Sequence, residues 1–338
     1  MPEGELLRYL NDVEVHGMPY YYVIPSAAVL GGHGNPRSEE FTFFIDRSVE
    51  PSLLTVVASS RTFSGNILWK VSLNNVTLTR EFKPQTLVEL EEGYYAVHVF
   101  DVSNITKSFT GKYVLKVSCE SSSPVRISAA FIVGSMSYEG MKGYLTVDLG
   151  VLAIKPGESA SISLPSGFKG KKDLLLVVYD SPSRLASMGI DVDGVKEGIS
   201  EKVGVDELLI DKECGECRVK LLHKESPITY FPKSFKVYGV ARYRAEYLGP
   251  KVELVRSEVN GSVIKCVVKN VGDVVADKVM IVGMGMGEVL FREYLSKLEP
   301  GSEYVFSKEL GSDRVRPVVI RLIYHNLVGQ AVETYMIK

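Results

Sequence analysis

The feature that most constrains the fold of this 338-residue chain is an internal repeat. Residues 29–135 and 151–240 can be aligned so that short apolar runs and turn residues follow one another in the same order. The matched runs are 29–30 with 151–152, 41–43 with 162–164, 52–57 with 173–178, 71–76 with 190–195, 99–101 with 209–211, 115–120 with 219–224, and 133–134 with 238–239. Each single match is weak, but their common order indicates a tandem duplication of one domain.

The runs are typical of β-strands. They are rich in β-branched and aromatic residues and are bounded by Gly, Pro, Asn, Asp or Ser. Asn74-Asn75 and Asp193-Gly194 break two of them with residues that tolerate the positive φ of a two-residue hairpin. Only residues 4–10, 203–209 and 291–298 have even a briefly helical pattern. We therefore predict an all-β protein in which each copy of the repeat is a jelly-roll-like β-sandwich.

After Gly249-Pro250 the pattern changes to a single series of strands without a third copy. Apolar runs and turn signals over about 90 residues predict an immunoglobulin-like sandwich. The predicted domains are two jelly-roll-like sandwiches, at residues 1–138 and 139–248, followed by an immunoglobulin-like domain at residues 249–338.

Composition excludes several classes of partner. The 39 Lys and Arg balance 41 Asp and Glu, so the net charge of −2 predicts no nucleic-acid partner. The longest apolar runs, such as residues 174–179, are far shorter than the ~20 residues that a membrane helix needs, which predicts no membrane span. A chain with two glutamines and abundant Lys and Glu is typical of a thermophile.

The C-terminal region carries a succession of turn motifs: Lys269-Asn270-Val271-Gly272-Asp273, then 298–302, then 323–329. This succession resembles the immunoglobulin-like repeats of archaeal S-layer-like proteins and the related cell-adhesion domain CARDB. The duplicated region, with its opening at residues 16–20 and 30–34, is similar to a domain of archaeal surface proteins that precedes such repeats. The resemblance implies a fold and a cell-surface setting, and it implies no active site.

The compartment stays open between two expectations. The resemblance implies an extracellular or cell-surface protein. Residues 1–5 have neither the basic nor the apolar region of a secretory signal, so the protein is expected to be cytoplasmic or to have had its signal removed. Asn75, Asn104 and Asn260 each begin an Asn-X-Ser/Thr sequon and would be N-glycosylation sites outside the cell.

Cys214-Gly215-Glu216-Cys217 is the one clustered pair among four cysteines. Such a pair can form a disulfide, bind zinc or act in redox chemistry. Structural zinc needs four ligands and no second pair lies at a matching spacing, and a thioredoxin-like site needs a βαβ context that the pattern lacks. A disulfide or unpaired thiols are therefore favoured over metal or redox chemistry, and no cofactor is predicted.

Catalytic motifs are absent from the sequence. There is no Gly-x-Ser-x-Gly elbow and no HExxH, and the five histidines are scattered. His98 alternates with two valines, so it is expected to face solvent or to be hydrogen-bonded on a strand. Tyr20, Tyr21, Trp69 and Tyr94 are candidates for stacking on sugar rings, although most tyrosines at strand spacing pack half-buried.

These observations favour a structural or adhesion protein without enzymatic activity, part of an archaeal cell envelope or extracellular assembly. Its expected partners are other protein subunits or cell-surface glycans, and free edge strands of the sandwiches allow a homo-oligomer. The alternative is a carbohydrate-binding protein that uses the jelly-roll domains. A metal- or thiol-dependent enzyme built around Cys214 and Cys217 is the third hypothesis.

Overall fold

The computed structural model describes residues 2–24, 28–63, 67–165, 170–211, 217–224, 234–310 and 317–337. These residues are almost entirely strands, with one short helix, α1 (Ser103–Ser108), in the described part of the chain. The prediction of an all-β sandwich protein is confirmed. None of the described helical segments is long and apolar enough to cross a membrane.

The first sandwich consists of two sheets. In order across its inner sheet are β2 (Gly17–Ile24), β11 (Val125–Ser137), β5 (Val49–Ser60), β9 (Gly93–Asp101) and β8 (Thr86–Leu90), with β3 (Ala28–Leu30) also paired to β11. Across its outer sheet are β4 (Ser38–Ile45), β10 (Gly111–Glu120), β6 (Leu68–Leu73) and β7 (Val76–Thr79). Trp69, Tyr113 and Leu54 are among the buried side chains between the two sheets.

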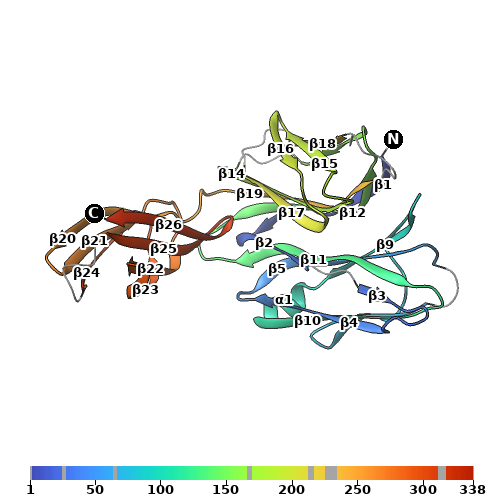
Figure 1. Cartoon of the computed structure of the whole chain (residues 1–338), viewed down its shortest axis with the longest axis horizontal. Coiled ribbons are helices and arrows are strands. Elements are labelled where there is room, and N and C mark those ends of the chain that lie inside the picture. The colour runs from blue at the N-terminus through green and yellow to red at the C-terminus, as the bar shows by residue number, and fades with distance from the viewer. Residues whose placement is uncertain are drawn as a thin grey trace. The chain divides into compact units, whose positions relative to one another are not determined.

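The second sandwich has equivalent strands in the same order. Across its inner sheet are β1 (Glu3–Val15), β12 (Gly143–Ile154), β19 (Phe235–Ala245), β14 (Lys172–Ser181) and β17 (Gly204–Asp211). Across its outer sheet are β13 (Ser159–Ser163), β18 (Arg218–Lys224), β15 (Ser187–Val192) and β16 (Val195–Ile199). The order β13-β18-β15-β16 repeats β4-β10-β6-β7, and β19-β14-β17 repeats β11-β5-β9, so the two sandwiches share these strand orders and differ at the edges of their inner sheets, where β8 is added in the first and β1 in the second. Figure 1 labels β14, β15 and β18 in the second sandwich and β4, β5 and β10 in the first.

The inner sheets of the two sandwiches pack against each other. β19 is buried at every position and β11 at nearly every position, whereas β18 and β10 of the outer sheets alternate between buried and exposed. At the contact, a Cβ on Gly239 of β19 would lie 3.3 Å from the ring of Phe131 on β11, so this glycine lets the sheets approach. The sequences of inner strands, which are buried on both faces, are continuous apolar runs. The sequences of outer strands, which are exposed on one face, alternate between apolar and polar residues.

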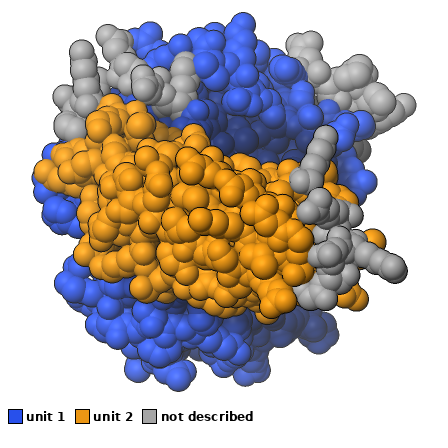
Figure 2. All heavy atoms as spheres, turned by 90° about the vertical axis from the view of Figure 1, so that its left-hand side faces the viewer, with its two compact units in different colours: residues 1–137, 143–169, 173–244 blue, residues 138–142, 170–172, 245–338 orange. Residues whose placement is uncertain are grey.

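By its contacts the chain forms two compact units, coloured separately in Figure 2. Both sandwiches, residues 1–137, 143–169 and 173–244, form the first unit. The predicted first domain, residues 1–138, included the first strand. In the structure β1 instead pairs antiparallel with β12 and completes the second sandwich. Residues 3–15 therefore belong to the sandwich that follows them by more than a hundred residues.

The second unit contains the immunoglobulin-like sandwich together with residues 138–142 and 170–172. One sheet contains β20 (Val252–Asn260), β21 (Val263–Asn270) and β24 (Glu303–Glu309), and the other contains β23 (Glu288–Leu298), β22 (Ala276–Gly285), β25 (Val318–Asn326) and β26 (Gly329–Ile337). Asn270, from the turn motif that carries the family resemblance, is fully buried. Its amide nitrogen donates to the carbonyl oxygens of Val274 and Leu298, and its amide oxygen accepts from the backbone of Lys251 and Gly272.

The three segments with a helical pattern are strands: residues 4–10 lie in β1, 203–209 mostly in β17, and 291–298 in β23. All three are edge strands of their sheets. An edge strand has only one neighbour and its burial is uneven along its length, which blurs the period-two alternation that marks a strand in the sequence. Sheet pairing therefore overrode the local pattern.

Candidate functional site

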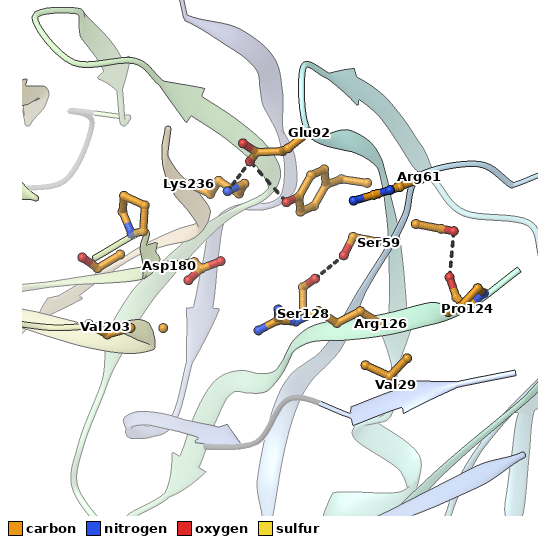
Figure 3. A pocket seen from close by; sticks show the side chains of 15 residues that line it. Val29, Ser59, Arg61, Glu92, Pro124, Arg126, Ser128, Asp180, Val203 and Lys236 are labelled. Carbon is orange, nitrogen blue, oxygen red and sulfur yellow. Dashed lines mark hydrogen bonds and ion pairs between the residues drawn. The ribbon is translucent and has the colours of Figure 1, made fainter. Parts of the chain in front are cut away.

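A polar cavity of about 450 Å³ lies inside the first unit, where the two sandwiches meet. Equivalent strands of the two copies bring it together: β5 and β14 end there, and β11, β19, β9 and β17 begin there. The cavity is lined by Val29, Ser59, Ser60, Arg61, Glu92, Tyr95, Pro124, Arg126, Ser128, Asp180, Ser181, Pro182, Val203, Gly204 and Lys236. Figure 3 shows Asp180, Lys236 and Val203 on one side of it and Arg61, Ser59 and Pro124 on the other.

Lys236 and Glu92 form an ion pair that joins the two sandwiches across the cavity. The Lys236 side chain, at the start of β19, is only 7% exposed, and Glu92 lies in the turn between β8 and β9 with 31% of its side chain exposed. The Tyr95 hydroxyl donates to the same Glu92 oxygen at 3.3 Å, and the ammonium lies 5.3 Å from the centre of the Tyr95 ring. The carboxylate and the ring together hold the buried ammonium in position.

Asp180 is the second carboxyl of the cavity and lies at the end of β14. The Tyr238 hydroxyl donates to it at 3.1 Å. Burial raises the pKa of Asp180, and the charge of Glu92 adds to that rise, while Lys236, Tyr238 and Arg126 oppose it. Asp180 therefore takes up a proton more readily than an exposed aspartate does.

The serines of the cavity supply neutral hydrogen-bonding groups. The Ser59 and Ser128 hydroxyls are 2.6 Å apart, and the Ser60 hydroxyl donates to the Pro124 carbonyl oxygen at 2.8 Å. Burial raises the pKa of Tyr95, so its phenol stays protonated near neutral pH and acts as a donor. The lining thus combines carboxylate and hydroxyl acceptors with ammonium, guanidinium and hydroxyl donors.

This arrangement is suited to binding a small polar molecule. Its volume lies in the range of about 300–1,000 Å³ that is common for small-molecule sites. Among the described residues no group of three or more His, Cys, Asp or Glu is placed to hold a metal ion. Glu92 is also engaged by an ammonium, which competes with a cation for the carboxylate.

The predicted sugar-stacking residues do not line this cavity. Trp69 is 2% exposed and stacks on His98 inside the first sandwich, so its ring has no free face for a sugar. Tyr20 and Tyr21 are half-buried and border a small cavity of about 20 Å³. Tyr94 is half-buried on β9, where its hydroxyl donates to Glu89. The expectation for Trp69 failed because the sequence gives no indication of which strand face is covered.

Two of the three sequon asparagines lie close together. Asn75, Asn104 and Asn260 are all exposed, and the first two line one open groove of about 710 Å³ on the first sandwich. Asn75 has φ +64° in the β6–β7 hairpin turn. The hydroxyl of Thr106, the third residue of the Asn104 sequon, is buried and donates to the Val49 carbonyl oxygen.

The cysteine pair is only partly described. Cys217 is buried, and its backbone N–H donates to Asp193 at 3.0 Å, next to the β15–β16 hairpin. Cys214 lies outside the described residues, so a disulfide, zinc or thiol role for the pair stays a prediction. Cys119 and Cys266 are buried in separate sandwiches, where burial raises the pKa of both thiols.

Sequence reasoning did not find the charged residues of the cavity. Asp180 directly follows the apolar run 174–179, and Lys236 interrupts the apolar residues at the start of β19. A charged residue at the end of a continuously apolar strand was therefore the available signal, because such a strand is buried on both faces and its end borders the inter-sheet space. Glu92 and Arg61 had no comparable signal.

No known family model matches the chain, and no curated protein matches it in sequence. Among solved structures it is similar to PNGase F, a glycosylasparaginase from Flavobacterium meningosepticum, with 10% identity and a TM-score of 0.27 over 68% of this chain and 96% of that chain. It is also similar to the β-glucuronidase of Ruminococcus gnavus, with 11% identity and a TM-score of 0.23 over 56% of this chain and 36% of that chain. At these TM-scores neither similarity carries an inference about this chain.

Proposed function

We propose that the protein binds carbohydrate, without changing it chemically, in the cavity between its two sandwiches. The observation that carries the proposal is the lining of this cavity, in which hydrogen-bond donors and acceptors surround the buried Lys236 ammonium and the buried Tyr95. Sugar hydroxyls both donate and accept, so they are bound best where groups of both kinds converge. An apolar ligand would displace water from Arg61 and Arg126 without offering them hydrogen-bond acceptors, which is costly.

Glycan binding also fits the cell-surface setting that the family resemblance implies, and the adhesion role expected from the sequence. An adhesive surface protein needs a pre-formed site for a ligand on another cell or in the envelope, and the cavity belongs to one compact unit. A site between two packed sandwiches is also more rigid than one built on a loop, which reduces the entropy lost on binding. Other protein subunits and homo-oligomers stay part of this proposal as partners of the remaining surface.

A glycan array probed with the full chain tests the proposal, followed by calorimetry with each glycan that binds. Val203 lines the cavity and is 61% exposed, so Val203→Trp should narrow it without disturbing a core. We expect at least tenfold weaker binding for this variant. Leu222→Trp, at a 39% exposed position on the outer strand β18, is the matched control and should bind as the wild type does. Silence of the array with folded protein, or unchanged binding by Val203→Trp, would overturn the proposal.

A further inference from the structure

The charged groups of the cavity indicate which class of sugar it accepts. We propose that the ligand is an acidic sugar of the uronic acid class, whose carboxylate is bound by Arg61 and Arg126; this inference rests on the proposed carbohydrate function. Both arginines line the cavity and both are exposed, so they are accessible to a ligand. Neither forms an ion pair with any residue in the described part of the chain, although Lys236 in the same cavity does.

The balance of charge points the same way. The cavity contains three cations, Arg61, Arg126 and Lys236, against two carboxyl groups, Glu92 and Asp180. The excess is one positive charge even when both carboxyls are ionised, in a chain whose net charge is −2. A ligand with one negative charge would neutralise that excess, whereas a neutral sugar would leave it unchanged.

The two carboxyl groups of the protein are already engaged. Glu92 accepts from Lys236 and Tyr95, and Asp180 accepts from Tyr238. The cavity therefore offers its free hydrogen-bonding capacity mainly on the guanidinium groups of Arg61 and Arg126, the second of which is near enough to Asp180 for its charge to lower the pKa of that carboxyl group. A guanidinium presents a planar pair of N–H donors that matches the two oxygens of a carboxylate.

The hydroxyls of the same sugar have partners as well. Ser59 and Ser128 lie near Arg126 in Figure 3, and each hydroxyl can donate or accept. Ser59 is the strand partner of Arg126 in the pairing of β5 with β11, and Ser128 lies at the irregularity of that pairing between Ile127 and Ala129. One ring can therefore place its carboxylate at the arginines and its hydroxyls at the serines.

Ligand-observed NMR titration of the full chain tests this inference with two matched pairs of probes. Glucuronate differs from glucose, and galacturonate from galactose, only by a carboxylate in place of the C6 hydroxymethyl group. We expect at least one acidic sugar to bind tenfold or more tightly than its neutral counterpart, and its affinity to fall as salt is raised. Arg126→Gln and Arg61→Gln should each weaken the acidic sugar about tenfold and leave the neutral sugar within twofold.

Arg218→Gln is the control variant, because Arg218 is exposed on the outer strand β18 and lies outside the cavity. Thermal melting of all three variants shows whether they fold as the wild type does. Equal binding of acidic and neutral sugars would overturn the inference and leave the proposed function intact. Preference for a phosphorylated or sulfated sugar over a uronate would also overturn it. Failure of every sugar to bind would overturn the proposed function together with the inference.

Discussion

His98 makes the stability of the first sandwich depend on pH. Its ring is 1% exposed and faces the core, whereas the sequence predicted that it faces solvent or is hydrogen-bonded on its strand. It stacks on Trp69, with ring centres 5.1 Å apart, and meets the edge of Phe82 at 5.2 Å. Its Nε2 has no hydrogen-bond partner among the described residues. β9 belongs to an inner sheet that is covered on both faces, which is why alternation with valines did not place His98 outside.

Burial lowers the pKa of His98 from its usual 6.5 to about 4. Between these two values the unfolded chain binds a proton that the folded chain does not, so stability is full above pH 6.5 and is lost as the pH falls toward 4. At 1.36 kcal/mol for each pKa unit, this histidine removes about 3 kcal/mol from the free energy of unfolding. The loss is a large fraction of the ~5–15 kcal/mol that stabilises an ordinary domain.

Urea unfolding at pH 7 and at pH 4.5, followed by tryptophan fluorescence, measures this effect. Trp69 is the single tryptophan of the chain and touches His98, so the signal comes from the site itself. In His98→Phe the ring packs on the same neighbours but does not titrate. We expect the wild type to lose about 2–3 kcal/mol more than His98→Phe between the two pH values. If both proteins lose stability in parallel, the reasoning is refuted.

Three further substitutions, one of them with a control variant, test the packing. Glu92→Gln leaves the buried ammonium of Lys236 without its carboxylate and should lower the free energy of unfolding in urea by about 1–3 kcal/mol. Glu91→Gln, the control, changes an exposed ion pair and should lower it by under about 0.5 kcal/mol. Asn270→Ala removes four hydrogen bonds, two of them buried, and should lower the free energy of unfolding by about 2–4 kcal/mol; an unchanged value would contradict its structural role. Gly150→Ala would place a Cβ 2.2 Å from a backbone oxygen of β1, so we expect a loss of about 1–3 kcal/mol and faster amide exchange along β1.

The sequence was sufficient for the class of fold and for its turns. Asn74 and Asn75 adopt φ of +47° and +64°, and Asp193 adopts +46°, as two-residue hairpins require. These turns could be predicted because a positive φ selects a few residue types locally. The order of the repeated strands was also readable, since each run of the alignment lies on or beside a strand of its copy.

The packing of whole sheets could not be read in the same way. Pairing of β1 with β12 joins residues that are separated by about 140 positions, and nothing local in residues 3–15 specifies that partner. The charged cavity depends on the same long-range packing, because Glu92 and Lys236 meet only when the inner sheets face each other. A motif search finds groups that are close in sequence, and the residues of this cavity come from separate strands of two copies.

Sequence differences between equivalent strands of the two sandwiches explain why the lining of the cavity is asymmetric. When the alignment of 52–57 with 173–178 is extended by a few residues, Ser59 of β5 aligns with Asp180 of β14. Equivalent strand ends therefore carry a neutral residue in one sandwich and an acidic residue in the other. Two identical copies would line the space between them symmetrically. Because the residues differ, the cavity instead has carboxyl groups engaged by Lys236 and tyrosines, together with two arginines that form no ion pair within the described part of the chain. Under the proposed function such an asymmetric lining would orient a ligand that carries its charge at one end, and the paired acidic and neutral sugars test that property directly.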